Sequence, residues 1–367
     1  MGLACAYAAA KRKQRVLVLE RDAFAQGASI RNFGMIWPIG QPAGKLLDLA
    51  LHSRDLWLDL AKQYSLPIRE CGSLHVAHFD DEWSLLQEFA SDALNAGYQV
   101  RLLTREEVLE IAPAVNPVEL RGGMHSQTEC GVDPPRCIQA LTKLLRERLD
   151  VTIDSGACVT QVDPFIAASD GRRWKAERVI VASGTDVQTL YPAAFQQSAL
   201  RLCKLQMLST QPQSAGYSIG PHLASGLTLR HYTTFRQCPS LSAVVQRVAN
   251  LWPELDRWGI HVMLSQPEDG RVILGDSHQY DADISPFQQE EIDRLMLTQL
   301  QRVFRLPDWT IARRWVGYYL KNSADVLFLN CPSTNVRLVT GLGGNGMTLS
   351  MAVGERLIDT FDNPRIV

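Results

Sequence analysis

The chain has 367 residues, of which 46% are hydrophobic and 21% are charged, and its formal net charge at pH 7 is −2. This length exceeds what one simple core supports, so two domains are expected. A nearly neutral chain without a run of like charges offers no basic surface for nucleic acid or for an anionic membrane. The composition therefore favours small-molecule chemistry over polymer binding.

Targeting and metal-binding patterns are not evident. No apolar stretch approaches the roughly 20 residues that a membrane helix needs. Residues 3–10 are apolar, but positive charges follow them instead of preceding them, unlike in a signal peptide. The eight cysteines include no C-x-x-C pair, and no histidine cluster has zinc spacing. We therefore expect a cytoplasmic protein with no metal site.

The N-terminal residues have the order of the helix and second strand of a dinucleotide-binding βαβ unit. Residues 2–10 are small and apolar, and Val16 to Leu19 form a buried-strand pattern that ends at Glu20. Gly2 stands where the last glycine of G-x-G-x-x-G would be. The first strand and two glycines of that fingerprint are absent. We expect either a start placed inside the true gene or a real truncation, and we favour the misplaced start.

The next segments alternate between loops and regular elements. Residues 27–44 have the glycine and proline punctuation of a loop. Residues 45–64 have apolar positions at helical spacing, residues 71–79 have a strand pattern, and a helix is predicted from about Asp81 to Ala96. Residues 131–163 predict a helix that begins near Pro134 and is followed by two short strands.

The second half of the chain is richer in strand patterns. Residues 176–184 predict a buried strand that ends on a glycine turn, and residues 204–280 contain several β-rich runs, including 227–235. A helix of about 20 residues is predicted from Pro286. Residues 335–361 predict a strand, a glycine-rich turn and a helix. Elements of the α/β type thus occur at both ends and in the middle, with antiparallel β material between them.

Four segments in order resemble the FAD-dependent amine oxidase family, which includes D-amino-acid oxidase, glycine oxidase and sarcosine oxidase. They are VLVLERD (16–22), GASIRNFGMI (27–36), VIVASG (179–184) and TGLGGNGMT (340–348). Taken singly, each also fits an ordinary strand end, polar loop or glycine turn. Together they span essentially residues 1–365.

The resemblance implies an α/β fold with a Rossmann-like FAD-binding domain and a second α+β substrate domain built on an antiparallel sheet. The implied FAD-binding domain is discontinuous and comprises residues 1–70, 126–203 and 310–367. The implied substrate domain comprises residues 71–125 and 204–309.

The resemblance also implies how FAD is held. Glu20 would accept hydrogen bonds from the adenosine ribose, because the carboxyl end of its strand faces the cofactor crevice. Small residues in 27–36 would let the backbone approach the pyrophosphate, with Ser29 and Asn32 donating to phosphate oxygens. The last glycine turn would direct N–H groups and a helix dipole at the flavin. The implied FAD-binding residues are Gly2, Glu20, Arg21, Ala28, Ser29, Asn32, Gly34, Met35, Val159, Ala182, Gly184, Gly343, Gly344, Asn345, Gly346, Met347 and Thr348.

Two departures from the family pattern restrict the chemistry. Sarcosine oxidases attach their flavin through a cysteine, but Trp315 stands at that place and none of the eight cysteines fits, so FAD is expected to be non-covalent. Relatives of glycine oxidase hold the substrate carboxylate with arginines at two places, where this chain has Tyr319 and Gly344. An ordinary α-amino acid is therefore a poorer substrate candidate.

Other residues are candidates for holding the substrate. If residues 227–235 form a strand, Arg230 and Tyr232 share a face that suits a phosphonate or carboxylate, with His231 on the other face. Any one of these three residues could equally well be an ordinary surface residue without a role in binding. Arg314, Tyr318 and Tyr319 are expected near the flavin, and His278 is a further candidate. The candidate catalytic residues are Arg230, His231, Tyr232, His278, Arg314, Tyr318 and Tyr319.

Several stretches, among them CGSLHVAHFDDE (71–82), resemble a bacterial subgroup associated with aminophosphonate breakdown. The expected activity is oxidation of a C–N bond in a small amine by hydride transfer to flavin N5, followed by imine hydrolysis. Oxygen or another acceptor would take the electrons. Two alternatives stay open: a 2-hydroxy-acid dehydrogenase, which would need a base such as His231 or His278, and a truncated, non-catalytic flavoprotein remnant.

Overall fold

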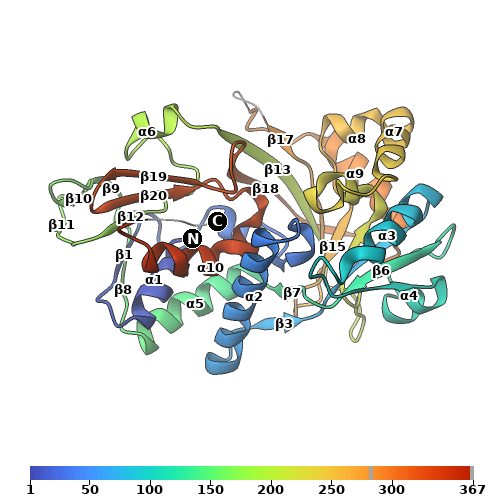
Figure 1. The fold of residues 1–367 in the computed structure, drawn as a ribbon, viewed down its shortest axis with the longest axis horizontal. Helices are drawn as coiled ribbons and strands as arrows, with labels where there is room; N and C mark the ends of the chain where they lie inside the picture. The colour runs from blue at the N-terminus through green and yellow to red at the C-terminus, as the bar shows by residue number, and fades with distance from the viewer. Residues whose placement is uncertain (281–283, 364–367) are drawn as a thin grey trace.

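The computed structural model describes residues 1–280 and 284–363. Figure 1 shows two parts joined by the long strands β13 (Leu200–Thr210) and β18 (Ile311–Asn322). The part on the left contains the N-terminus and several short sheets, and the part on the right contains one large sheet. No described helix is long and apolar enough to span a membrane.

Four helices fill the left part, and they confirm the predictions at residues 2–10, 45–64 and 134. They are α1 (Gly2–Lys11), α2 (Lys45–Tyr64), α5 (Pro134–Arg148) and α10 (Gly346–Asp359). Helices α1 and α10 cross closely at Gly354, where a Cβ would lie 2.8 Å from the carbonyl carbon of Ala4. Only glycine allows this approach without a shift of the backbone. The short helix α6 (Pro192–Gln196) lies at the edge of this part.

Two parallel strand pairs form the centre of the left part. Strand β1 (Leu17–Glu20) pairs with β8 (Thr152–Ser155), and β12 (Val179–Val181) pairs with β20 (Val336–Thr340), which also pairs with antiparallel β19 (Phe328–Ser333). The strand predicted at 16–19 is confirmed, but its start and its burial differ from the prediction. The strand begins one residue later, and Leu17 is 39% exposed because this side of β1 borders a cavity.

Two smaller sheets complete this part. One contains β9 (Val159–Gln161), β10 (Ile166–Ala168) and β11 (Arg173–Trp174), and the other contains β2 (Met35–Ile36), β7 (Cys130–Val132) and β3 (Ile68–Glu70). The segment predicted as a loop at 27–44 contains β2 and two 3-10 turns, η1 (Ala28–Ile30) and η2 (Pro38–Gly40).

The large sheet has the order β17-β13-β16-β15-β14-β4-β6-β5, with β18 along β13. Strands β14 and β4 pair in parallel, and the other neighbouring strands among the described residues pair antiparallel. The predicted antiparallel sheet is therefore confirmed apart from one pair. The remaining strand bounds are β4 (Ser73–Ala77), β5 (Val100–Leu103), β6 (Gly122–Ser126), β14 (His222–Ser225), β15 (Met263–Ser265), β16 (Ile273–Gly275) and β17 (Gln279–Tyr280).

Helices pack against this sheet and bury its apolar residues. They are α3 (Asp80–Ala93), α4 (Arg105–Ile111), α7 (Leu241–Leu251), α8 (Pro253–Arg257) and α9 (Glu290–Val303). Leu74, Leu274 and Met296 belong to one core that joins the sheet to α9. The helix predicted from Pro286 is shorter than expected, because it begins at Glu290 with acidic residues in its first turn.

Two further sequence predictions need correction. Residues 227–235 do not form a strand but the 3-10 turns η3 (Gly226–His231) and η4 (Thr233–Phe235). Local bonds such as Tyr232 N–H to Leu229 O close these turns, and the hydroxyl of Thr228 accepts from Val262 N–H at 3.0 Å. The predicted domain boundary at 203/204 falls inside β13, and β18, assigned to the FAD-binding domain, belongs to the large sheet.

Candidate functional site

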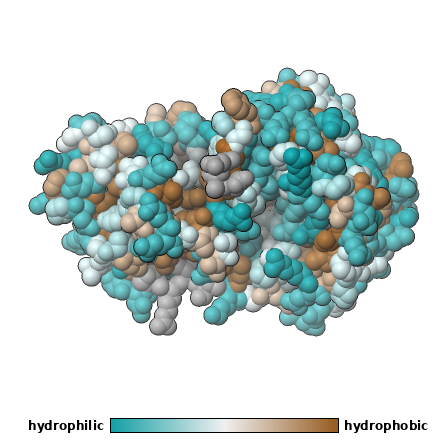
Figure 2. All heavy atoms as spheres, turned by 90° about the horizontal axis from the view of Figure 1, so that it is seen from above, coloured by the Kyte–Doolittle hydropathy of each residue, from teal (hydrophilic) through white to brown (hydrophobic). Residues whose placement is uncertain are grey.

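One cavity of about 2710 Å³ runs through the molecule, and both parts contribute residues to its lining. Figure 2 shows the molecule from above, with hydrophilic residues over most of the surface and hydrophobic residues gathered toward the middle of the left half. Apolar side chains of both parallel strand pairs, including Val18 and Ile180, line the cavity. This space is large enough for an extended cofactor together with a small ligand.

The residues predicted to hold FAD line this cavity with one exception. They lie at the starts of α1 and α10, in or just after β1, η1, β9 and β12, in β2, and in the turn before α10. The set comprises Gly2, Glu20, Arg21, Ala28, Ser29, Asn32, Met35, Val159, Ala182, Gly184, Gly343, Gly344, Asn345, Gly346, Met347 and Thr348. The exception is Gly34, which turns against β7 with a φ of +73°. A Cβ there would lie 2.0 Å from the carbonyl oxygen of Val132, so its role is in the turn.

Two helices begin at the cavity. Helix α1 starts at Gly2 and helix α10 at Gly346, and both glycines line the cavity. Unpaired N–H groups and the positive end of the dipole make a helix N-terminus attractive to phosphate. A Cβ on Gly346 would meet nothing within 4 Å, and one on Gly344 would meet only the hydroxyl of Tyr319, at 4.0 Å. The turn thus leaves open space beside two positive helix ends, which fits a flavin dinucleotide.

The loop at residues 27–36 is held by Asn32. Its amide nitrogen donates to the carbonyl oxygens of Ala28 at 2.8 Å and Ser29 at 3.1 Å, and its oxygen accepts from Gly34 N–H at 2.8 Å. Both amide hydrogens are therefore used within the loop. Asn32 thus shapes the loop, and both Ser29 and Asn32 line the cavity.

Neighbouring segments fix the last glycine turn from outside. Thr348 accepts from Trp37 N–H at 2.9 Å through its hydroxyl, and the Met347 carbonyl accepts from the indole N–H of Trp57 at 3.0 Å. The side-chain oxygen of Asn345 accepts from the side-chain amide of Gln41 at 3.0 Å. These bonds hold the turn in position without occupying its open face.

A row of histidine and tyrosine rings forms the other end of the cavity. The rings of His231 and His261 stack at 4.0 Å and 15°, and His261 lies 4.5 Å from His278. Next to them the hydroxyls of Tyr280 and Tyr319 form a 3.0 Å hydrogen bond. All five residues line the cavity. Since Tyr319 also approaches Gly344, this ring row, as we call these five residues, extends to the glycine turn before α10.

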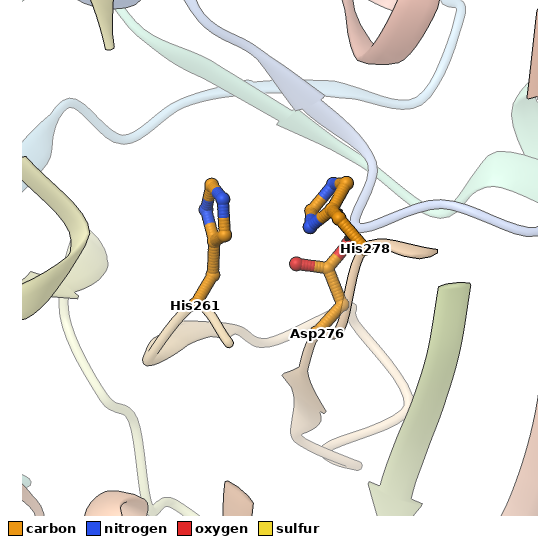
Figure 3. A group of neighbouring side chains, drawn as sticks. All are labelled: His261, Asp276 and His278. Carbon is orange, nitrogen blue, oxygen red and sulfur yellow. Dashed lines mark ion pairs between the residues drawn. The ribbon is translucent and has the colours of Figure 1, made fainter. Parts of the chain in front are cut away.

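Burial determines the charge of the ring row. It lowers the pKa of His261 and of His231 well below the ordinary histidine value, and neighbouring cations lower both further. Both imidazoles are therefore neutral at pH 7. Burial raises the pKa of the Asp276 carboxyl, which lies beside His261 and His278 (Figure 3). The pKa of Tyr319 is also raised by burial, so its hydroxyl stays protonated.

The two predicted arginines do not reach the cavity lining. The Arg230 side chain is only 4% exposed and donates to Asp256 at 2.9 Å as well as to the carbonyls of Leu227 and Ile260. Arg314 is 43% exposed and donates to Asp293 at 3.0 Å. Tyr232 and Tyr318 do line the cavity, together with His231, His278 and Tyr319. The structure thus brings together five of the seven candidate catalytic residues.

The family model described as DAO, FAD dependent oxidoreductase, matches residues 1–360. The chain belongs to this family. FAD is therefore its cofactor, in agreement with the cavity geometry.

Two curated proteins are similar in sequence to this DAO-family chain. Glycine oxidase of Geobacillus kaustophilus (strain HTA426) is 27% identical over 202 residues, which cover 50% of this chain and 52% of that protein. The match thus spans only about half of that relative. One of the subunits of opine oxidase from Rhizobium meliloti is 22% identical over 343 residues, covering 88% of this chain and 80% of that protein.

Solved structures share the fold. Glycine oxidase from Geobacillus kaustophilus superposes with a TM-score of 0.75 at 17% identity, covering 99% of this chain and 92% of that one. Iminodiacetate oxidase from Chelativorans sp. BNC1 has a TM-score of 0.74 at 16% identity, covering 99% and 93%. At these identities the likeness establishes the fold alone.

Sequence reasoning missed His261, Asp276, Tyr280 and Lys321 as residues of this DAO-family cavity. A signal was present in the run GDSHQY (275–280), where Asp276, His278 and Tyr280 alternate as they would on one face of a strand. His261 had no such signal. It comes close to them because His261 N–H donates to the Asp276 carbonyl at 2.7 Å.

Proposed function

We propose that this protein oxidises the C–N bond of a small amine that carries an anionic group, with 2-aminoethylphosphonate or its N-methyl derivative as the substrate. The observation that supports this most is that the FAD side of the cavity and the ring row meet at Gly344 and Tyr319. A small molecule between them would contact both. The similar proteins named glycine oxidase and iminodiacetate oxidase make an amine the favoured substrate class.

The chain's own residues would bind and orient both reactants. When bound, FAD supplies the acceptor for a hydride from the carbon that bears the nitrogen. The N-terminus of α1 and Ser29 would line its diphosphate, and the N-terminus of α10 would face its flavin ring. Met207 and Met263 give the cavity an apolar wall near the ring row, which keeps water from the reacting carbon.

Orientation of the amine is assigned to the tyrosines. Tyr319 stays protonated. Its hydroxyl can therefore accept from the Tyr280 hydroxyl and donate to the substrate, or donate to Tyr280 and accept from the substrate. Lys321 also lines the cavity, and its ammonium nitrogen lies 5.7 Å from the centre of the Tyr280 ring. This cation supports an anionic end group on the substrate, since neither Arg230 nor Arg314 lines the cavity.

The test is anaerobic reduction of the bound flavin. The yellow protein is mixed with 2-aminoethylphosphonate, its N-methyl derivative, glycine, and 2-hydroxyethylphosphonate, which differs from the first only by a hydroxyl in place of the amine. We expect bleaching by the two aminophosphonates and none by the hydroxyl analogue. Bleaching by glycine alone would contradict the aminophosphonate, and no bleaching by any amine would contradict the whole proposal.

One observation favours a second function, the oxidation of an alcohol. Removal of a hydroxyl proton needs a base, and the neutral rings of His231 and His261 stand at the cavity. A glycerophosphate oxidase from Mycoplasma pneumoniae also shares the fold, with a TM-score of 0.71 at 16% identity. Bleaching by 2-hydroxyethylphosphonate but not by the amines would establish this alternative.

A further inference from the structure

Three side chains of the ring-row wall converge on one point. His261, Asp276 and His278 each offer a ligand atom, and these atoms all lie within 4.8 Å of one another. Figure 3 shows the two rings and the carboxylate pointing toward a common space. Two ligands of one tetrahedral zinc ion lie about 3.3 Å apart, given bonds of roughly 2.0–2.1 Å. The observed separation of His278 Nε2 and Asp276 Oδ2, 3.6 Å, is close to this value.

Two backbone hydrogen bonds hold this arrangement. His261 N–H donates to the Asp276 carbonyl at 2.7 Å, and His278 N–H donates to the Trp258 carbonyl at 2.9 Å. The segment before β15 therefore runs beside the segment after β16, and this backbone pairing places the three side chains near one another. A metal site requires ligands held near one another, and here the ligand atoms, which all lie within 4.8 Å of one another, would close toward about 3.3 Å around a bound ion.

The hydrogen bonding of His278 favours a cation between the groups. Its Nδ1 lies 3.2 Å from the carbonyl oxygen of Gly259, which can only accept, so Nδ1 carries the hydrogen. In the neutral ring, Nε2 then presents a lone pair to the carboxylate of Asp276. A carbonyl that orients the far nitrogen of an imidazole is the usual outer contact of a metal-bound histidine.

His261 supplies the third ligand atom. Neither of its ring nitrogens has a hydrogen-bond partner among the residues that the structure describes, and stacking on His231 fixes the plane of the ring. A proton shared between two side chains would account for only two of these groups. Three ligand atoms that converge on one point match a bound metal ion. Neutral imidazoles and a carboxylate are ligands that divalent first-row metals accept.

We propose that His261, Asp276 and His278 bind one divalent transition-metal ion, of the Zn²⁺ or Fe²⁺ class. All three residues line the cavity, so the remaining coordination positions face the space between the ring row and the glycine turn. Three protein ligands with an open position are typical of sites where an exchangeable molecule binds. An oxyanion of the substrate could take that position in place of an arginine, and this last step rests on the proposed function.

The site differs from the sequence expectation of no metal. That expectation considered short spacings of cysteine and histidine along the chain. Here the first ligand lies 15 positions before the second, and only the pairing of the two segments brings them together.

The test is the zinc content of the flavin-containing protein after treatment with EDTA and equilibrium dialysis against micromolar ZnCl₂, with any affinity tag removed. We expect one zinc ion per chain in the parent. His261→Phe and Asp276→Asn keep the shapes of the side chains and should bind zinc at least about tenfold more weakly. His231→Phe is the matched control, because it keeps the stacked ring and removes no ligand, and it should bind as the parent does.

The outcomes separate this site from the proposed activity. A melting curve of each variant shows that it is folded, and His278→Phe provides a further variant if one is not. A parent without zinc, or equal zinc in the parent, His261→Phe and Asp276→Asn, would overturn the proposal. Because zinc is measured without substrate, a protein that oxidises an amine yet binds no zinc overturns only the metal site. One that binds zinc and oxidises no amine overturns only the function.

Discussion

The two ends of the cavity are built in different ways. At the end that we propose holds FAD, here called the cofactor end, the wall is made of backbone, small residues and the starts of α1 and α10, and Gly344 and Gly346 leave open space. At the other end the ring row fills the wall with large titratable side chains, such as His261 and Tyr319. One end thus presents main-chain N–H groups to a ligand, and the other presents side-chain nitrogen and oxygen atoms.

This difference has consequences for substitution. A backbone-built site is damaged by adding a side chain, because the added atoms occupy the place of the ligand. A site built from side chains is changed by removing or titrating a group. Substitutions at the cofactor end should therefore alter flavin retention, whereas substitutions in the ring row should alter the dependence on substrate.

The largest effect is expected for Gly346→Asp. A Cβ at this position meets nothing in the protein, so the chain should still fold, but the carboxylate would stand beside the negative cofactor. An uncompensated buried charge costs about 3–5 kcal/mol, which corresponds to at least about a hundredfold weaker FAD binding. The measurement is the flavin to protein ratio after gel filtration, with Gly346→Ala as the control. A fully yellow Gly346→Asp protein would show that this turn does not contact FAD.

Arg230→Ala should reduce stability without changing substrate affinity. The nearly buried guanidinium bonds to Asp256 and to two carbonyls, and bonds to charged groups contribute about 1.5–3 kcal/mol. We expect the free energy of unfolding to fall by roughly 2–3 kcal/mol, with an unchanged half-saturation in flavin reduction. Arg105→Ala, on the surface, is the control and should be neutral. A large rise in half-saturation with unchanged stability would instead make Arg230 the anion clamp.

A pH effect is expected from His75, which packs between Trp37 and Phe235 outside both ends of the cavity. Burial lowers the pKa of His75 to about 3. Since the unfolded chain protonates this ring near pH 6.5, the native state loses stability as the pH falls below that value. At pH 5 the loss is about 2 kcal/mol, from 1.36 kcal/mol per pH unit.

The measurement is urea unfolding at pH 8 and pH 5 of the parent and of His75→Phe. The variant removes the titration and keeps a ring between Trp37 and Phe235. Between pH 8 and pH 5, the free energy of unfolding should fall by about 2 kcal/mol less in the variant than in the parent. Equal decreases would mean that His75 is already protonated or solvated in the native state.

The smallest effect is expected for Tyr280→Phe. The variant loses one neutral hydrogen bond, to Tyr319, which contributes about 1 kcal/mol. We expect about a fivefold higher half-saturation for the amine and normal flavin content. Tyr98→Phe is a matched control, because the Tyr98 hydroxyl is also buried and bonded but does not line the cavity. An equal change in both variants would contradict a specific role for the ring row.

The gathering of the proposed FAD-binding residues on one cavity wall was largely predictable from the sequence. Its residues lie in short segments at strand ends, such as Glu20 and Gly346, where the local pattern of strand, glycine and helix determines the backbone. Gly34 was the error there, because its φ of +73° serves a contact with β7 that no local pattern reveals.

The ring row was only partly predictable. His261 reaches Asp276 through backbone pairing between separate segments, and a single sequence does not specify such pairing. Arg230 was misplaced for a related reason. The alternation in residues 227–235 is typical of a strand, but the hydroxyl of Thr228 bonds to the backbone of Val262 and the segment folds into 3-10 turns.

The most direct test of a shared cavity is the rate of anaerobic flavin bleaching by 2-aminoethylphosphonate with and without deuterium on the carbon that bears nitrogen. At saturating substrate, the account predicts that bleaching is several times slower with the deuterated amine, because that C–H bond breaks at the junction of the two ends, near Gly344 and Tyr319. Bleaching that is equally fast with both, or absent with both while the protein retains its flavin, would contradict it.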